Sequence, residues 1–432
     1  MQKVLILSYF FPPCNLTASQ RAYGWAKYLN MFGYYPVIIT RSWQVPISKP
    51  EDGFKKSGNE IVIEKQEGFE IHYLPYFPSL RDKLFISKNK NSFSQFLQKT
   101  LTFVELLSYG FTSFFISYKN IYQYACDYLK KNNDIKALVV TANPFVMFKF
   151  GYLLNKEFGI KWIADYRDDW GTSDLTKPIT FPEKLIAYLD KRNEKKWVSS
   201  ASLIMSISEH YVKKISSFTN VKGEVILNGY LKEDAERLNT NMANCFTIVY
   251  NGTLYNTQPV EEVLEGFRFF VNKYPTTTFK LLFVGAAFDP VQEQRILKKA
   301  EQLNLLPYIE VTNRKPKVEV MQIQKSAHVL LMIAHKGYKG VPSSKLYEYL
   351  SLAKPVVSYP CDEDIIDETL KGYNLGYTCA SKQLLTSVFD DLYAKYKDVK
   401  YSELVADELY IELFSREHQT KKLAEMLRQF KN

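Results

Sequence analysis

The segment Gly340-Val-Pro-Ser-Ser-Lys-Leu-Tyr-Glu-Tyr-Leu-Ser-Leu-Ala-Lys-Pro-Val-Val-Ser358 predicts a loop, a helix, a turn and a buried strand. Pro342 and the serines at 343 and 344 mark the helix start, with Ser344 as the expected N-cap. Pro355 ends the helix, and the two valines after it begin the strand. One helical face is apolar, because its side chains recur every three or four residues at Leu346, Tyr349, Leu350 and Ala353.

The opposite face of this helix carries Lys345 in the first turn and Glu348 one turn later. A lysine there opposes the helix dipole, which favours anions at that end, and lysine before glutamate is the poorer order for a helical ion pair. A docked anion such as a diphosphate would explain the lysine, since free backbone N–H groups and the ammonium would bind it together. The alternative is a solvated lysine beside a glutamate that offsets the dipole. Helix physics alone leaves both open.

Composition predicts a two-domain globular protein that binds something anionic. The chain has 432 residues, which exceeds the size at which one core keeps growing, and 46% of them are hydrophobic. A net charge of +10 suits nucleic acid, an anionic membrane surface or an anionic ligand. Because the basic residues are scattered and no zinc finger or other short nucleic-acid motif occurs, we expect no nucleic-acid partner.

The cysteines and the apolar segments predict a cytoplasmic location. The five cysteines are widely spaced without a CxxC pair, which is typical of free thiols in a reducing compartment. The apolar run near the N-terminus is too short for a signal peptide and suits a buried first strand at Val4–Leu7. The nearest approach to a membrane span is 101–118, and Glu105 and Gly110 interrupt it.

The order of elements predicts an α/β fold built from two doubly wound sheets. Strand, loop, helix and strand follow one another from Val4 to Thr40, and the pattern restarts at Phe246–Tyr250. Neither GxGxxG nor GxxxxGK[ST] occurs in the chain. The predicted parts are an N-terminal domain at 1–231, a polar linker at 232–244, a second domain at 245–412, and a C-terminal helix in 413–432 that packs back on the first domain.

Two regions of the first half are candidates for function. Residues 84–130 are rich in lysine and aromatic side chains, so 84–125 could lie on a membrane surface, although helices packed on the sheet are the alternative. The turn Asp165-Tyr-Arg-Asp-Asp-Trp170 follows a buried strand, where polar residues line the ligand crevice of a parallel sheet. The candidates there are Asp165, Arg167, Asp168 and Asp169, with Asp168 favoured. A cluster that only caps the next helix is the alternative, and His210 at a later helix start is interpreted as structural.

Six segments, in this order, resemble the retaining nucleotide-sugar glycosyltransferases of family 4, and the resemblance runs over nearly the whole chain. They are Lys3-Val-Leu-Ile-Leu-Ser-Tyr-Phe-Phe-Pro-Pro13, Asp165–Trp170, Asn228-Gly229, Tyr250-Asn-Gly-Thr253, Lys280-Leu-Leu-Phe-Val-Gly285 and Pro342–Val356. The last looks like the donor-binding PSK-x-x-EYLA-x-GKPV segment of bacterial cell-surface polysaccharide transferases.

The resemblance implies a GT-B fold, in which two doubly wound Rossmann-like domains face each other across a cleft. The second domain would bind a nucleotide-sugar and the first a glycan or lipid-linked acceptor. Transfer would retain the anomeric configuration without a metal or a cofactor, the nucleotide-sugar being a co-substrate. The implied setting is surface polysaccharide synthesis in the bacterial cytoplasm, at the inner face of the plasma membrane.

The resemblance also assigns residues. Lys345 lies where the segment meets the diphosphate, Glu348 matches the glutamate that contacts the donor ribose, and Asp168 would orient the acceptor. Lys345 and Asp168 are thus the expected catalytic residues. The other implied residues are Gly252, Thr253, Gly285, Arg314, Ser343, Ser344 and Leu346 on the donor side, and Asn15, Ser19 and Arg167 on the acceptor side.

Three single positions and one loop depart from the family pattern. The family pairs two glutamates eight residues apart, and Gly340 occupies the first of these positions. The arginine and lysine of the family align with Thr253 and Gln258, and Asn15–Ser19 replaces a glycine-rich loop. Lys345, the helix N-terminus and Arg314 would then have to balance the charge of the leaving diphosphate. Two other functions stay open: a nucleotide-sugar epimerase on the same fold, and a non-catalytic relative that binds glycan or membrane.

Overall fold

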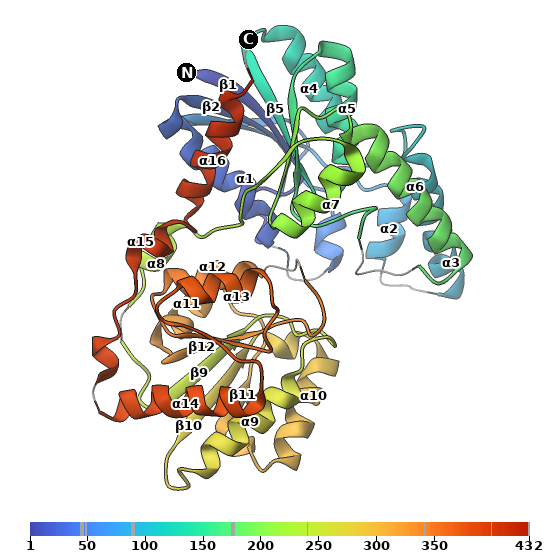
Figure 1. The fold of residues 1–432 in the computed structure, drawn as a ribbon. Coiled ribbons are helices and arrows are strands. Elements are labelled where there is room, and N and C mark those ends of the chain that lie inside the picture. Colours follow the sequence, from blue (N-terminus) through green and yellow to red (C-terminus); the bar gives the residue numbers. More distant parts are fainter. Residues whose placement is uncertain are drawn as a thin grey trace. The chain divides into compact units, whose positions relative to one another are not determined.

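The computed structural model describes the whole chain except residues 44–46, 48–49, 88–90, 174–177, 240, 340–342, 399 and 431–432. The chain forms two compact units (Figure 1). The first contains Met1–Leu227 and Gln419–Asn432, and the second contains Asn228–His418. Among the described residues, no helix is long and apolar enough to cross a membrane.

The first unit has an eight-stranded sheet in the order β3-β4-β2-β1-β5-β6-β7-β8. All neighbouring strands are parallel except β3 and β4. The strands are β1 (Gln2–Ser8), β2 (Tyr34–Arg41), β3 (Val62–Gln66), β4 (Phe69–Leu74), β5 (Ile135–Ala142), β6 (Trp162–Tyr166), β7 (Leu203–Ser206) and β8 (Gly223–Val225). The central strands are nearly continuous runs of apolar residues, because helices cover both faces of a parallel sheet.

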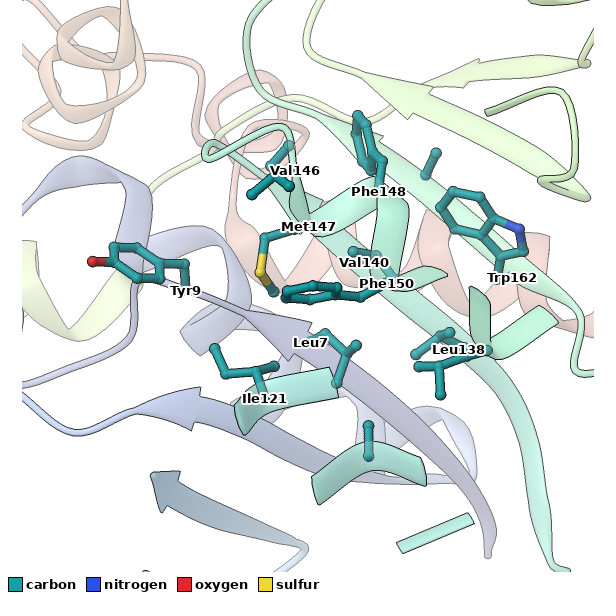
Figure 2. Packing of buried hydrophobic residues seen from close by; sticks show 14 of the residues in the cluster. Leu7, Tyr9, Ile121, Leu138, Val140, Val146, Met147, Phe148, Phe150 and Trp162 are labelled. Atoms are coloured by element: carbon teal, nitrogen blue, oxygen red, sulfur yellow. The ribbon is translucent and has the colours of Figure 1, made fainter. Parts of the chain in front are cut away.

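Most helices of this unit pack on the two faces of its sheet. They are α1 (Thr17–Tyr28), α2 (Leu80–Ile86), α3 (Ser92–Ser108), α4 (Asn120–Lys131), α5 (Met147–Phe158), α6 (Phe181–Val198) and α7 (Glu209–Thr219), with most of α16 (Arg416–Arg428). On the face covered by α1 and α16, the core includes Val4, Ile6, Trp25, Leu423 and Leu427. On the other face, as Figure 2 shows in part, it includes Leu5, Leu7, Phe148, Phe150 and Trp162.

The second unit has a six-stranded parallel sheet in the order β11-β10-β9-β12-β13-β14. The strands are β9 (Phe246–Asn251), β10 (Phe279–Val284), β11 (Ile309–Val311), β12 (Val329–Ile333), β13 (Val356–Tyr359) and β14 (Gly376–Thr378). The helices are α8 (Lys232–Glu236), α9 (Val260–Asn272), α10 (Pro290–Gln302), α11 (Lys317–Ser326), α12 (Ser344–Ser351), α13 (Ile365–Gly372), α14 (Lys382–Lys397) and α15 (Glu408–Glu412). The predicted α/β class with two doubly wound sheets is confirmed.

The segment expected as a linker, 232–244, begins with the short helix α8 and belongs to the second unit. Its start, with the residues just before it, is bonded to the first residues of α16 and to Phe414. The backbone of Tyr230 pairs with Phe414 and Arg416 at 3.1 and 2.8 Å, and Lys232 forms an ion pair with Glu417 at 3.0 Å. These contacts join two distant parts of the sequence. They hold the start of this polar segment in place, which its composition alone does not indicate.

The packing of α5 on the sheet generates a stability prediction. A Cβ added to Gly151 would lie 2.7 Å from two ring atoms of Trp162. We expect Gly151→Ala to lower the free energy of unfolding by about 1–3 kcal/mol, because overpacking outweighs a helix-propensity gain of roughly 1 kcal/mol. Gly53→Ala is the control, since its added Cβ would meet no atom within 4 Å. Urea unfolding of both variants measures the difference, and equal stability would contradict the packing described for α5.

Candidate functional site

The start of α12 in the second unit presents a cation without an acidic partner. The Lys345 ammonium donates a hydrogen bond to the Tyr250 hydroxyl at 3.1 Å and lies 4.6 Å from the centre of that ring. Within the described residues, no carboxylate lies at ion-pair distance from Lys345. Tyr250 is buried near the end of β9, and its hydroxyl donates in turn to the Thr253 carbonyl at 3.0 Å. The ammonium is therefore held at the carboxyl end of the sheet without being neutralised.

The predicted N-cap of this helix is wrong by one residue. Ser343 is the N-cap, with extended backbone angles, and Ser344 is the first helical residue. The Ser343 side chain makes no capping hydrogen bond, so it leaves the N–H groups of the first turn without that partner. Leu346 is fully buried and anchors the helix. Gly340–Pro342, the predicted loop before it, lie outside the described residues.

One glycine makes room for the lysine, and a second lies beside the first. Gly252 follows β9 with a φ of +104°, and a Cβ there would lie 2.5 Å from the Lys345 Cε and 2.8 Å from its Nζ. Gly285 follows β10 with a φ of +83°, and its Cβ would lie 3.8 Å from the Gly252 Cα and 4.0 Å from the Arg314 Cγ. Other residues rarely adopt such φ values, which explains glycine at both positions. The predicted residues Gly252, Gly285, Arg314 and Lys345 thus come together.

Arg314 supplies a second cation at this edge. Its guanidinium carbon lies 3.6 Å from the centre of the Phe288 ring, so it stacks on an aromatic face. No carboxylate in the described part of the chain pairs with it. The ends of β9 and β10 and the start of α12 therefore concentrate positive charge, which suits a phosphate-containing ligand.

Glu348 is the acidic group of this helix. Its side chain is half-buried, and desolvation raises the pKa of its carboxyl, while Lys317, Arg416 and Lys345 act in the opposite direction. Its carboxylate accepts no hydrogen bond from the described residues. Glu348 therefore has acceptor capacity available for hydroxyl groups.

Sequence reasoning missed three residues of this site. Tyr250 and Tyr349 lie in apolar runs, where no signal separates them from core residues, yet the Tyr349 hydroxyl accepts from the Asn251 amide at 2.9 Å and ties α12 to β9. His335 follows β12, so the strand-end rule could have found it. Its Nδ1 lies 2.6 Å from the Thr257 hydroxyl, and desolvation followed by the charge of Lys345 lowers its pKa.

Gln258, at a position where the family has a cation, holds the backbone. Its side-chain amide donates to the Ile333 carbonyl and accepts from the Tyr255 amide at 3.0 Å. It is buried, so it supplies neither charge nor an exposed donor. The positive charge of the site therefore comes from Lys345 and Arg314.

In the first unit, the aspartates at the end of β6 and in the turn after it differ from one another. Asp165 is fully buried and forms an ion pair with Arg21 at 2.7 Å. Arg21 also donates to the carbonyls of Ile226 and Leu227 at 2.8 and 3.0 Å. These bonds connect α1, β6 and the end of β8, so Asp165 is structural, contrary to its place among the site candidates.

The side chains of Asp168 and Arg167 are partly exposed to solvent. They pair with each other at 2.7 Å, and the Asp168 side chain is 49% exposed. Asp169 is buried 3.8 Å from Lys214, and burial raises its pKa. His210, expected to be structural, is exposed at the start of α7.

The two other acceptor-side residues hold loops in this structure. The Asn15 side chain pairs with the backbone of Ile47 at 2.8 and 3.2 Å. Ser19 is fully buried and donates to the Cys14 and Leu16 carbonyls at 2.7 and 2.8 Å, so it does not face an acceptor. In the described part of the unit, neither hydrogen-bonds to Arg167 or Asp168.

Solved structures share this architecture over their full length. They include the glycosyltransferase from Rickettsia africae ESF-5 (13% identity, 99% of this chain and 98% of that chain, TM-score 0.57). Sucrose-phosphate synthase from Thermosynechococcus elongatus matches with 14% identity, 99% of both chains and a TM-score of 0.60. HepE from Anabaena, in complex with UDP and glucose, matches with 13% identity, 99% of this chain and 100% of that chain, and a TM-score of 0.57.

The chain has the GT-B fold. No protein-family model matches it, and no curated protein matches its sequence. In this GT-B chain, the unneutralised cations lie at strand ends of the second unit, and the reachable Arg167–Asp168 pair lies in the first. Among the described residues, no group of three or more histidine, cysteine, aspartate or glutamate side chains could hold a metal ion.

The contrast between the aspartates can be tested by stability. We expect Asp165→Asn to lower the free energy of unfolding by about 3–5 kcal/mol, because it leaves the buried Arg21 charge without a partner. Asp168→Asn should cost less than about 1 kcal/mol, because that ion pair is solvent-exposed. Guanidinium unfolding followed by circular dichroism compares the two, and equal losses would contradict the structural role given to Asp165.

The carboxyl groups on α6 predict a pH effect. Glu194 is fully buried and accepts from the Tyr166 hydroxyl at 3.0 Å, and burial raises its pKa to about 7. The folded state therefore binds this proton more tightly than the unfolded chain, so stability falls as pH rises from about 4.5 to above 7. In Glu194→Gln, the fall should shrink by on the order of 2–3 kcal/mol. A residual slope is expected, because burial also raises the pKa of Asp190 to about 6. The free energy of unfolding of the wild type and of the variant, measured across this pH range, tests the prediction. Equal slopes in the two proteins would contradict it.

Proposed function

We propose that this chain transfers a sugar, with retention, from a nucleotide-sugar to a glycan or lipid-linked acceptor. The observation that carries the proposal is the Lys345 ammonium, which lies against Gly252 at the start of α12 and has no carboxylate partner in the described chain. A half-buried cation without a counter-charge is stabilised when a diphosphate binds.

The donor diphosphate would bind where α12 begins. Its oxygens would accept from N–H groups of the first helical turn and from the Lys345 ammonium, with Arg314 adding charge from the neighbouring loop. Gly252 would leave room for this approach, since a Cβ there would already collide with Lys345. HepE, which shares the fold, holds UDP and glucose, and this favours a UDP-sugar among the possible donors.

Glu348 would bind the donor ribose. No described residue donates a hydrogen bond to its carboxylate, which is only partly solvated. Two ribose hydroxyls could therefore donate to its oxygens. It lies one turn from Lys345 on the helix, which would place phosphate and ribose contacts on one face. His335 and Thr257 form the adjoining strand-end pair and would border the same ligand.

Catalysis would rest on charge stabilisation. Negative charge develops on the diphosphate as the sugar–phosphate bond breaks, and a fixed cation lowers that barrier. The acceptor hydroxyl would attack on the face that the diphosphate leaves, and a leaving phosphate oxygen would take its proton. Asp168, reachable beside Arg167, would orient the acceptor.

The order of the six sequence segments supports family 4 and a role in bacterial surface polysaccharide synthesis. The lysine- and aromatic-rich residues 84–125 support a place at the inner face of the plasma membrane. A second candidate is a non-catalytic relative that binds glycan. The specific observation in its favour is Gln258, which is buried and uncharged where a family cation would lie. An epimerase on the same fold differs in needing no acceptor.

We expect Lys345→Met to lower turnover by about 10²- to 10³-fold with the fold intact, because the methionine keeps the stem and removes the charge. Lys273→Met, which removes an exposed lysine paired with Asp390, is the matched control and should leave turnover unchanged. Nucleotide release from a panel of nucleotide-sugars, with and without a lipid-linked acceptor, measures both.

The same assay separates the functions. Acceptor-dependent release supports transfer. Sugar interconversion without acceptor would instead identify an epimerase, and absence of both activities from a protein that binds glycan would identify the non-catalytic relative. Near wild-type kinetics of Lys345→Met would exclude the role given to this ammonium.

A further inference from the structure

One side of the first unit exposes large apolar side chains. Phe93, Phe96, Phe111 and Phe114, which we call the phenylalanine surface, are each between 68% and 78% exposed. Val104 and Phe115 lie among them, and Ile179, Phe181 and Tyr188 are exposed on α6 and just before it. Helices α3 and α6 contact each other, as Figure 1 shows, and soluble monomers rarely leave so many aromatic side chains without a partner.

Three members of the phenylalanine surface, Phe93, Phe96 and Phe111, follow one helical stripe. Phe93, Phe96, Thr100 and Val104 recur at the spacing of a single helical face, and all four are exposed. The amides of Phe111 and Thr112 donate to the Ser108 carbonyl at 2.9 Å, so the chain continues its helical turn after α3. Phe111 therefore extends the same stripe.

The charge around this stripe is positive. Residues 80–119 contain only two acids, Asp82 and Glu105, and both are buried. Arg81 pairs with Asp82 at 2.5 Å and with Glu105 at 3.3 Å. Lys83 and Lys99 are exposed, and Lys119 lies 4.7 Å from the Phe114 ring. In the described part of this segment, both acids are thus buried against Arg81, while Lys83 and Lys99 are exposed to solvent.

The turns that carry Phe111 and Phe114 are satisfied internally. The buried Lys149 ammonium donates to the carbonyls of Tyr109 and Thr112, both at 2.7 Å. The Phe114 amide donates to the Thr112 hydroxyl at 3.0 Å, and Lys119 donates to the Phe114 carbonyl at 3.3 Å. An unpaired backbone group is costly in an apolar medium. Because these backbone groups are already hydrogen-bonded, the turns could enter such a medium together with the rings of Phe111 and Phe114.

We propose that the phenylalanine surface binds an anionic phospholipid bilayer, with its rings at the boundary of headgroups and acyl chains and its lysines on the phosphates. A two-fold contact with a second copy fits less well, because it would bring the same lysine-rich surface onto itself. If the proposed transfer holds, a lipid-linked acceptor would be presented on the surface that the protein binds.

Sedimentation with vesicles tests the proposal independently of turnover. The vesicles are phosphatidylcholine with about 30 mol% phosphatidylglycerol, and pure phosphatidylcholine for comparison. We expect the wild type to bind the anionic vesicles more tightly, and high salt to weaken that binding. The double variant Phe93→Ser/Phe96→Ser should lose about tenfold or more in affinity. Lys99→Glu should weaken binding to the anionic vesicles only.

Phe269→Ser is the matched control, because Phe269 is 58% exposed on α9 in the second unit. It should bind vesicles like the wild type, and thermal unfolding should show all variants folded. Absence of vesicle binding by the wild type, or equal binding by the wild type and the double variant, would overturn the proposal. A wild-type dimer in light scattering that the double variant abolishes, without vesicle binding, would show instead that this surface joins two copies.

Discussion

The hydrogen bond between the Lys345 ammonium and the Tyr250 hydroxyl holds an unneutralised cation at the carboxyl ends of β9 and β10. A phenol and an aromatic face together stabilise a cation by about 1–2 kcal/mol, which is less than a phosphate would provide. The Lys345 ammonium is thus held in position before a ligand binds, and a phosphate could displace the Tyr250 hydroxyl from it. Gly252 and Gly285 are consequences of the same arrangement, since a side chain at Gly252 would collide with Lys345 and both residues adopt left-handed backbone angles.

In the first unit, a charge at a strand end is paired with an opposite charge instead of being left available for a ligand. Arg21 and Asp165 are both buried, form a bidentate pair and are further bonded to backbone carbonyls, so no capacity for a ligand remains. Three residues later, Asp168 is half-exposed, and Arg167 is its one partner within the described residues. The end of β6 and the turn after it therefore contain a structural aspartate and a solvent-accessible one, and the distinction depends on Arg21 in α1.

The sequence was sufficient for the parts of the fold that local patterns determine. Apolar runs located most strands of both sheets but not the edge strands β3 and β14, and the spacing of Leu346, Tyr349 and Leu350 located α12. Local patterns do not show which residues far apart in the sequence contact each other. Arg21 lies 144 residues before Asp165, so the motif alone could not show which aspartate is buried. The burial of Ser19, the structural role of Gln258 and the contact of Tyr250 with Lys345 likewise depend on tertiary packing.

We propose that Lys345 and the start of α12 bind the diphosphate of a nucleotide-sugar, and a crystal structure of the chain with bound UDP is the most direct test. We expect phosphate oxygens within hydrogen-bond distance of the Lys345 Nζ and of first-turn amides of α12, with the ammonium moved off Tyr250. UDP bound elsewhere, or at this edge with Lys345 still bonded to Tyr250 and no phosphate beside it, would show that this lysine does not bind the diphosphate.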